Sequence, residues 1–236
     1  MNRLTEPFRR AMSIYETEGL MPLARQAAAF AAGRVFRYET YYLYENDGSS
    51  FSKRGDVGLP PGVDGLAFRV VHTNEEADAL EAEGLRFRKY AGDARGRLDK
   101  GAMAFCVFVG HDLASIGWLC TTQRAKDSLN EPPPAKVDFS KKEAWAGGSW
   151  TNARYRRMGL YRYTSLKMVE YWLQQGIVKD KWAVDGRNVA SLAAESKTGN
   201  VRYAEGRLVR VLWWKHWWEK PLTAREQERD AEKAGR

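Results

Sequence analysis

The chain has 236 residues, of which 44% are hydrophobic and 29% are charged. This composition supports a sizeable core and excludes a globally disordered chain. No apolar run approaches the roughly 18 residues of a membrane-spanning helix, so no transmembrane segment is expected. The net charge is +8, and residues 141–220 contain 16 Lys and Arg against 7 Asp and Glu. An anionic partner is therefore expected to bind within this segment.

Cysteine and histidine usage predicts neither a disulfide framework nor a metal site. Cys106 and Cys120 are too few for a disulfide scaffold, and their spacing matches no metal-binding pattern. The first 25 residues contain three glutamates and lack the short basic start of a secretory signal. We therefore expect a cytoplasmic protein that binds no metal.

The first 65 residues predict a helical extension that includes one strand. Residues 5–37 favour two helices, and the aromatic-rich residues 38–46 favour a strand. Three roles stay open for this extension: a lid over an acceptor, a dimer contact, and contact with a membrane surface. The last is disfavoured because residues 1–46 contain 6 basic and 5 acidic residues. A homodimer is one option among these.

From Leu66 onward, strands and helices alternate. The order predicts a mixed sheet with helices on its faces, an α/β or α+β domain that extends to residue 222. Residues 127–140, with three consecutive prolines, predict a stiff linker, and the polar residues 223–236 predict a disordered tail or a frayed helix. The expected strands are 66–72, 101–110, 113–122, 141–151, 181–185, 201–203 and 208–214, and the expected helices are 73–83, 160–175 and 191–197.

The segment from Trp150 to Tyr161 connects a predicted strand to a predicted helix through a basic turn. The first N–H groups of a helix have no partner within it, and the helix dipole favours negative charge there. Arg156 and Arg157 add positive charge, and Gly159 lets the backbone approach a phosphate closely. The segment predicts an anion site, although a solvated basic turn has the same pattern. The charge alone would also suit a nucleic acid, for which the sequence has no motif.

Two motifs give the segment a more specific interpretation. Arg156–Tyr161 resembles the R/Q-x-x-G-x-G/A signature of the GCN5-related N-acetyltransferases. Asn188-x-x-Ser191, followed by Lys197, resembles the second motif of that family. The resemblance covers residues 66 to about 214. It implies the family's mixed, mostly antiparallel sheet flanked by helices.

The resemblance also implies a ligand, acetyl-CoA or another acyl-CoA, used as a co-substrate. In the family, backbone N–H groups of the loop hold the pyrophosphate, and the preceding strand pairs with the pantetheine arm as an added strand. Gly147 and Gly148 within the predicted strand favour a bulge or a close approach by another chain. The residues implied to bind the co-substrate are Ser149, Trp150, Thr151, Arg156, Arg157, Met158, Gly159, Leu160, Tyr161, Asn188, Ser191 and Lys197.

The sequence departs from the family pattern at two chemically important positions. Tyr161 stands where the signature has Gly or Ala, which puts a bulky side chain near the phosphates. Glu195 stands where many members have a tyrosine that protonates the leaving thiolate. Binding of an acyl-CoA is compatible with both changes, but the usual general acid is missing.

The implied reaction is direct transfer of an acetyl group to an amine. It requires a base for the amine and a donor for the carbonyl oxyanion, expected from a backbone N–H near residues 149–151. Glu143 and Asp185 are the candidate bases. Without a catalytic role, Glu143 would be a solvated surface charge, and Asp185 would cap the turn before Asn188. The acceptor amine is a small molecule, a peptide or a protein, and no nucleic acid is expected to bind.

Two other functions stay open. Transfer of a long acyl chain is suggested by the Trp-rich C-terminal region, although we expect Trp213, Trp214, Trp217 and Trp218 to pack over the sheet or the N-terminal helices. A non-catalytic acyl-CoA-binding module is suggested by Glu195.

Overall fold

The computed structural model describes residues 36–48, 62–129, 132–196, 200–223 and 225–227. The helices predicted within residues 5–37 lie outside the described residues, apart from the last two positions, which begin a strand. The chain divides into two compact units, one of Met1–Thr40 and Arg207–Trp218, the other of Tyr41–Gly206 and Glu219–Arg236. The predicted division at residue 65 stays a prediction. No helix in the described ranges is long and apolar enough to cross a membrane.

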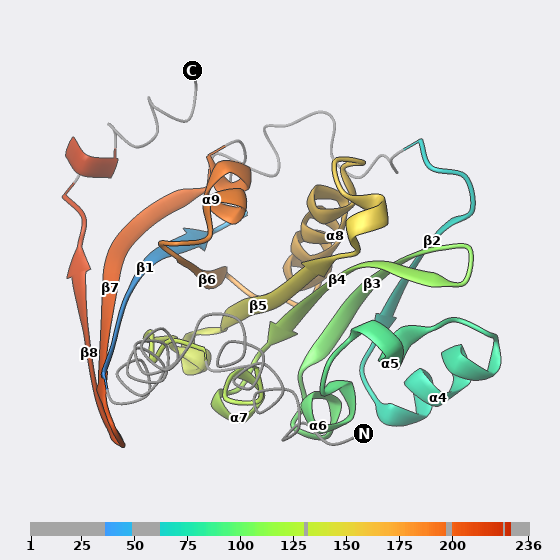
Figure 1. Cartoon of the computed structure of the whole chain (residues 1–236), viewed down its shortest axis with the longest axis horizontal. Coiled ribbons are helices and arrows are strands. Elements are labelled where there is room, and N and C mark those ends of the chain that lie inside the picture. The colour runs from blue at the N-terminus through green and yellow to red at the C-terminus, as the bar shows by residue number, and fades with distance from the viewer. Residues whose placement is uncertain (1–35, 49–61, 130–131, 197–199, 224, 228–236) are drawn as a thin grey trace, which may run out of the picture. The chain divides into compact units, whose positions relative to one another are not determined.

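The described strands form one mixed sheet in the order β2-β3-β4-β5-β6-β1-β7-β8 (Figure 1). Neighbours β5 and β6 run parallel, whereas β2 with β3, β3 with β4, β4 with β5, and β1 with β6 run antiparallel. The predicted fold class, a mostly antiparallel mixed sheet with helices, is confirmed. The strands are β1 (Phe36–Asn46), β2 (Leu66–Val71), β3 (Met103–Val109), β4 (Asp112–Cys120), β5 (Glu143–Thr151), β6 (Lys179–Asp185), β7 (Val201–Val211) and β8 (Trp214–Pro221).

Helices cover both faces of the part of the sheet formed by β3, β4 and β5. Trp172 of α8 packs with Phe105 and Leu119 on one face. The adjacent residue on β4, Trp118, points to the other face, where its ring lies 6.5 Å from that of Phe87 in α5. The helices are α4 (Asn74–Ala82), α5 (Phe87–Tyr90), α6 (Ala94–Asp99), α7 (Gln123–Lys126), α8 (Leu160–Gln174) and α9 (Val189–Glu195).

Three short helices, α5, α6 and α7, and one strand, β8, were not predicted. Each of α5, α6 and α7 spans only four to six residues, too short for a helical period to be recognised. The predicted strands at 201–203 and 208–214 are wrong as separate elements, because β7 is continuous. Its buried residues Ala204, Gly206 and Leu208 alternate with the period of a strand, and the charged residues between them concealed that pattern.

The turn between β7 and β8 exposes aromatic side chains. Leu212 there adopts a φ of 54°, which is uncommon for a branched residue and which the sequence did not indicate. Trp213 is 87% exposed and Trp214 is 53% exposed. These two tryptophans therefore do not pack over the described sheet, and the predicted packing over the N-terminal helices lies outside the described residues.

Candidate functional site

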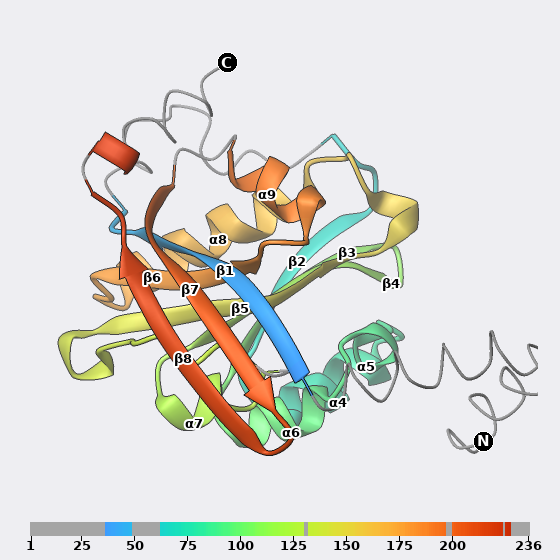
Figure 2. The ribbon, with the colours of Figure 1, turned by 60° about the vertical axis from the view of Figure 1, so that its left-hand side comes forward.

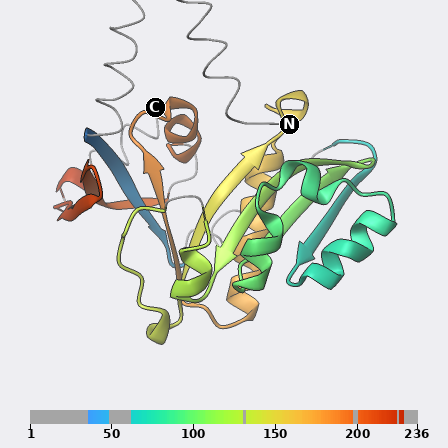
Figure 3. The ribbon, with the colours of Figure 1, turned by 60° about the horizontal axis from the view of Figure 1, so that its bottom comes forward.

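Strands β5 and β6 pair only at their beginnings. The parallel pairing runs from Glu143 with Lys179 to Trp145 with Lys181. Beyond this point β5 stays paired with β4 and β6 stays paired with β1, so the two strands diverge (Figure 3). We call residues 146–151 and 182–185 the fork, and its closed end is the last pair, Trp145 with Lys181. A fork of this kind presents backbone groups to which an extended ligand can add as a further strand.

A β-bulge interrupts β5 inside the fork. The pairing of β4 with β5 shifts between Ile116 and Trp118, opposite Gly148, and Gly148 adopts a φ of 59°. A Cβ atom at this position would lie 3.0 Å from Cδ1 of Trp118. The predicted bulge is confirmed, and both its backbone conformation and its packing require glycine.

Replacing Gly148 with alanine is expected to lower the free energy of unfolding by about 2–4 kcal/mol, from backbone strain and the clash with Trp118. Gly101→Ala is the matched control, because Gly101 also has a positive φ, of 84°, but a Cβ atom added there would have no neighbour within 4 Å. It should cost only about 1 kcal/mol. Urea unfolding of both variants measures the difference, and equal losses would show that contact with Trp118 contributes nothing.

The loop after β5 leads into the N-terminus of α8. Arg157 and Gly159 adopt positive φ values of 65° and 76°, and the helix begins at Leu160 without a side-chain cap. Among the described residues, none accepts a hydrogen bond from the backbone N–H groups of residues 157–161. The first turn of α8 contains no acidic residue, and both Arg156 and Arg157 are exposed. This geometry suits a phosphate or pyrophosphate.

The second motif forms the N-terminus of α9. Asn188 is the N-cap, and its Oδ1 accepts a hydrogen bond of 3.1 Å from the backbone N–H of Ser191. The spacing of the two residues therefore has a structural cause, capping of the helix. Contact of Asn188 or Ser191 with a ligand stays a prediction, and Lys197 lies outside the described residues.

Tyr161 and Glu195, the two departures from the family pattern, are hydrogen-bonded to each other. The Tyr161 hydroxyl donates to Glu195 Oε1 at 3.0 Å, and Asn200 Nδ2 donates to Glu195 Oε2 at 3.0 Å. This bond links α8 to α9, which lie on the same side of the sheet (Figure 2). Burial, together with the Glu195 carboxylate, raises the pKa of Tyr161. Tyr161 therefore stays protonated and ties the two helices together.

A third member of this buried group, Asp180, was not predicted. It lies on β6 and is 5% exposed, and its Oδ1 has no hydrogen-bond partner among the described residues. Burial and, second, the charge of Glu195 raise the pKa of Asp180 to about 8. Alternation along β6 places Asp180 with buried Val184 on one face, a signal that the sequence did contain.

The two candidate bases lie at opposite ends of the fork. Glu143 pairs with Lys179 near the closed end and Asp185 pairs with Tyr41 at the open end. Along β6, Lys179 and Asp185 are six residues apart, which corresponds to roughly 20 Å at about 3.3 Å per residue. The structure therefore does not bring Glu143 and Asp185 together.

Both candidate bases form ion pairs. Glu143 Oε2 accepts from Lys181 Nζ at 2.7 Å and from the Asp138 N–H at 2.8 Å. Burial raises the pKa of Glu143, but these hydrogen bonds outweigh it and the net pKa is lowered. Asp185 accepts from Arg187 through both carboxylate oxygens, the shorter contact being 2.6 Å to Nη2. At neutral pH the Glu143 carboxylate is therefore ionised and held in place.

Neither a metal nor a cysteine nucleophile is indicated in the described part of the chain. No group of three or more His, Cys, Asp or Glu side chains there is placed to hold a metal ion. Cys106 and Cys120 are buried free thiols, and burial raises the pKa of both, that of Cys120 to about 12. They are protonated at neutral pH and unsuited to nucleophilic attack.

Comparison with known proteins finds similar folds only. No protein-family model and no curated protein sequence matches the chain. Among solved structures, a GCN5-related N-acetyltransferase-like protein from Streptococcus suis is 16% identical with a TM-score of 0.44, over 89% of this chain and 76% of that one. A tandem GNAT protein from the clavulanic acid biosynthesis pathway is 17% identical with a TM-score of 0.47, over 83% of this chain and 58% of that one.

A third similar structure has no assigned function. It comes from Staphylococcus epidermidis, is 11% identical with a TM-score of 0.43, and is matched over 86% of this chain and 68% of its own length. A fourth similar structure, a GCN5-related N-acetyltransferase from Kribbella flavida, is matched over 53% of its length. Across these four structures the chain spans between about half and three quarters of their length, up to 76% for the Streptococcus suis protein. These likenesses concern the fold and give no activity.

Proposed function

We propose that the chain is an acyl-CoA-dependent N-acyltransferase that transfers an acetyl group from acetyl-CoA to an amine by direct attack. The observation that carries the proposal is the continuity of the fork with the anion-binding loop. Strand β5 runs from the closed end of the fork through residues 146–151 to the loop at 156–161. Acetyl-CoA has matching parts in the same order: a thioester, an extended amide-bearing arm, and phosphates.

In this proposal, the chain's backbone supplies most of the binding groups. N–H groups of residues 157–161 hold the pyrophosphate, with Arg156 and Arg157 adding charge. The free edge of Ser149–Thr151 pairs with the pantetheine amides. The oxyanion donor, expected near residues 149–151, is placed in this proposal at a backbone N–H of β5 nearer the closed end of the fork, because Ser149–Thr151 pairs with the pantetheine amides.

Glu143 is the better candidate for the base because it lies toward the closed end. Its carboxylate accepts a proton from the attacking amine, directly or through a water molecule. A C–N bond then forms, the C–S bond breaks, and the thiolate of coenzyme A takes up a proton. Lys181 keeps Glu143 ionised before the amine arrives.

A non-catalytic acyl-CoA-binding module is the second candidate function. Both candidate bases are ion-paired, and Tyr161 occupies one carboxylate oxygen of Glu195. Titration calorimetry with acetyl-CoA, octanoyl-CoA and palmitoyl-CoA tests binding, and CoA-thiol release over a panel of amines tests turnover. We expect acetyl-CoA binding and turnover. Binding without turnover would favour the module, tighter binding of palmitoyl-CoA would favour long-chain transfer, and binding of no acyl-CoA would contradict the proposal.

Glu143→Gln is expected to lower kcat about a hundredfold, the size typical of general-base removal, with an unchanged Kd for acetyl-CoA. Asp185→Asn is the control, since it removes a carboxylate from the open end of the fork, and should change kcat by less than about threefold. Steady-state kinetics and calorimetry measure both parameters. A larger loss of kcat in Asp185→Asn would assign the base to Asp185 instead.

A further inference from the structure

A cavity of about 620 Å³ lies beside the closed end of the fork. Ala144 of β5 packs against α8, so the neighbouring Glu143 and Trp145 point to the opposite face of the sheet. Glu143 and Lys181 line the cavity, together with residues of α7 and of the segment 132–138. The cavity is therefore on the face of β5 and β6 away from α8. Its volume suits a small molecule.

Lys126 is the most deeply buried charge of this cavity, with 2% of its surface exposed. Its Nζ donates to the carbonyl oxygen of Ala135 and lies 4.5 Å from the centroid of the Trp145 ring. Among the described residues, no carboxylate forms an ion pair with it. Burial lowers the pKa of Lys126, opposed by the more distant Asp127 and Glu219. A carbonyl and an aromatic face replace only part of the hydration that a buried ammonium loses.

The carboxylates that line the cavity already have partners. Glu143 binds Lys181 at 2.7 Å, Asp127 accepts from Gln123 at 2.7 Å, and Asp138 accepts from Ser140 at 2.5 Å. Lys136, a second lining lysine, likewise forms no ion pair in the described part of the chain. The lining contains four lysines and three carboxylates, a surplus of one positive charge. Of these lysines Lys126 is the buried one and has no carboxylate partner among the described residues, so an anion bound there would compensate its ammonium group.

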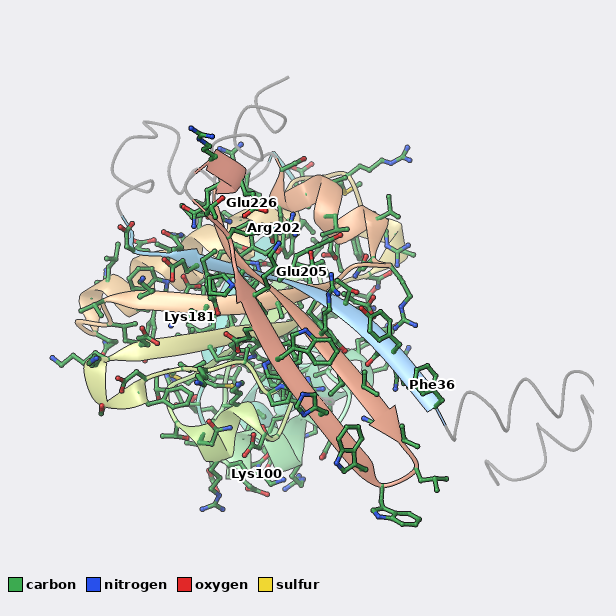
Figure 4. The ribbon with its side chains drawn as sticks, turned by 90° about the vertical axis from the view of Figure 1, so that its left-hand side faces the viewer. Phe36, Lys100, Lys181, Arg202, Glu205 and Glu226 are labelled. Atoms are coloured by element: carbon green, nitrogen blue, oxygen red, sulfur yellow. The ribbon has the colours of Figure 1, made fainter. Side chains whose placement is uncertain are left out.

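We propose that this cavity binds the carboxylate or phosphate of a small anionic ligand, with Lys126 and Lys136 as its charge partners. The proposal rests on the proposed function, in which the ligand is the acceptor. Its acidic end is held by the two lysines, and its amine reaches the closed end of the fork. Lys181, which is labelled in Figure 4, marks that end of β6. The acceptor class is thus a small amine that also carries a carboxylate or phosphate, and not a protein lysine.

The test uses the full chain and two anions without an amine, succinate and inorganic phosphate, titrated by calorimetry. We expect Lys126→Met to weaken binding of one of them at least tenfold, and the more affected anion identifies carboxylate or phosphate as the ligand group. Lys100→Met, which changes an exposed lysine that does not line the cavity, should have no effect. If Lys126→Met fails to fold, Lys136→Met, at the second lining lysine, must weaken binding measurably.

Kinetics then link the cavity to the acceptor. Glutamate and phosphoethanolamine are compared with glutamine and ethanolamine, and Lys126→Met should raise KM at least tenfold for the acidic amines only. Equal anion binding in wild type, Lys126→Met and Lys136→Met would overturn the proposal, as would equal KM changes for acidic and neutral amines. Acetyl-CoA affinity is measured in the same samples. If acetyl-CoA does not bind, the proposed function is contradicted. Anion binding by the cavity is tested separately, by the succinate and phosphate titrations alone.

Discussion

Gly159→Asp is expected to weaken acetyl-CoA binding at least a hundredfold, a change of about 2.7 kcal/mol. Gly159 adopts a φ of 76° and precedes the uncapped first turn of α8. A carboxylate there would oppose a bound pyrophosphate, and two unit charges about 4 Å apart near a protein surface repel by about 4 kcal/mol. It would also accept hydrogen bonds from the N–H groups that the phosphates require. Titration calorimetry measures the Kd.

The matched control is Gly159→Asn, which has nearly the same shape and tolerates a positive φ but adds no charge. Its affinity should fall by less than about tenfold. A similar large loss in both variants would mean that backbone geometry, and not charge, limits binding. Unchanged affinity in Gly159→Asp would contradict the placement of the phosphates at residues 157–161.

Asp180→Asn is expected to remove a fall in stability that the wild-type protein shows between about pH 4 and pH 8. The pKa of Asp180 is raised from 3.8 to about 8 in the folded state, so the folded chain binds a proton that the unfolded chain has lost. The contribution of Asp180 to the free energy of unfolding is therefore fully present below about pH 4 and is lost as the pH rises to about 8. The limiting slope for one proton is about 1.4 kcal/mol per pH unit.

Urea unfolding of the wild type and Asp180→Asn at pH 4, 6 and 8 measures this slope. The variant should be comparable to the wild type at pH 4 and more stable at pH 8, because Asn stays neutral. Asp64→Asn, at an exposed position, should retain the wild-type pH dependence. Parallel stability curves for the wild type and Asp180→Asn would show that Asp180 is ionised in the folded protein.

The parts of the site that follow one another along the chain could be predicted from the sequence. The strand ending at Thr151, the basic turn with Gly159 and the helix from Leu160 occur where expected, because local pattern and backbone conformation determine them. Gly148 also indicated its bulge, since glycine within a strand has few other causes. The fork itself could not be predicted from the residues, because pairing between β5 and β6 depends on residues far apart in the chain.

The features that depend on tertiary packing were missed. The bond between Tyr161 and Glu195 joins two helices, so each residue appeared in the sequence only as an isolated departure. The cavity depends on α7, a helix of four residues, and on the proline-rich segment that was predicted as a linker. Lys126 gave no sign of burial, because lysine is usually exposed and its neighbours are polar.

Amide hydrogen exchange with and without acetyl-CoA tests the central claim most directly. If acetyl-CoA adds to β5 as an extended strand and its phosphates bind the loop, protection will appear in residues 146–151 and 157–161. Strands β2 and β3 serve as internal references and should exchange at the same rate in both samples. Protection of both segments is the predicted result, and saturating acetyl-CoA that protects neither of them would contradict the account.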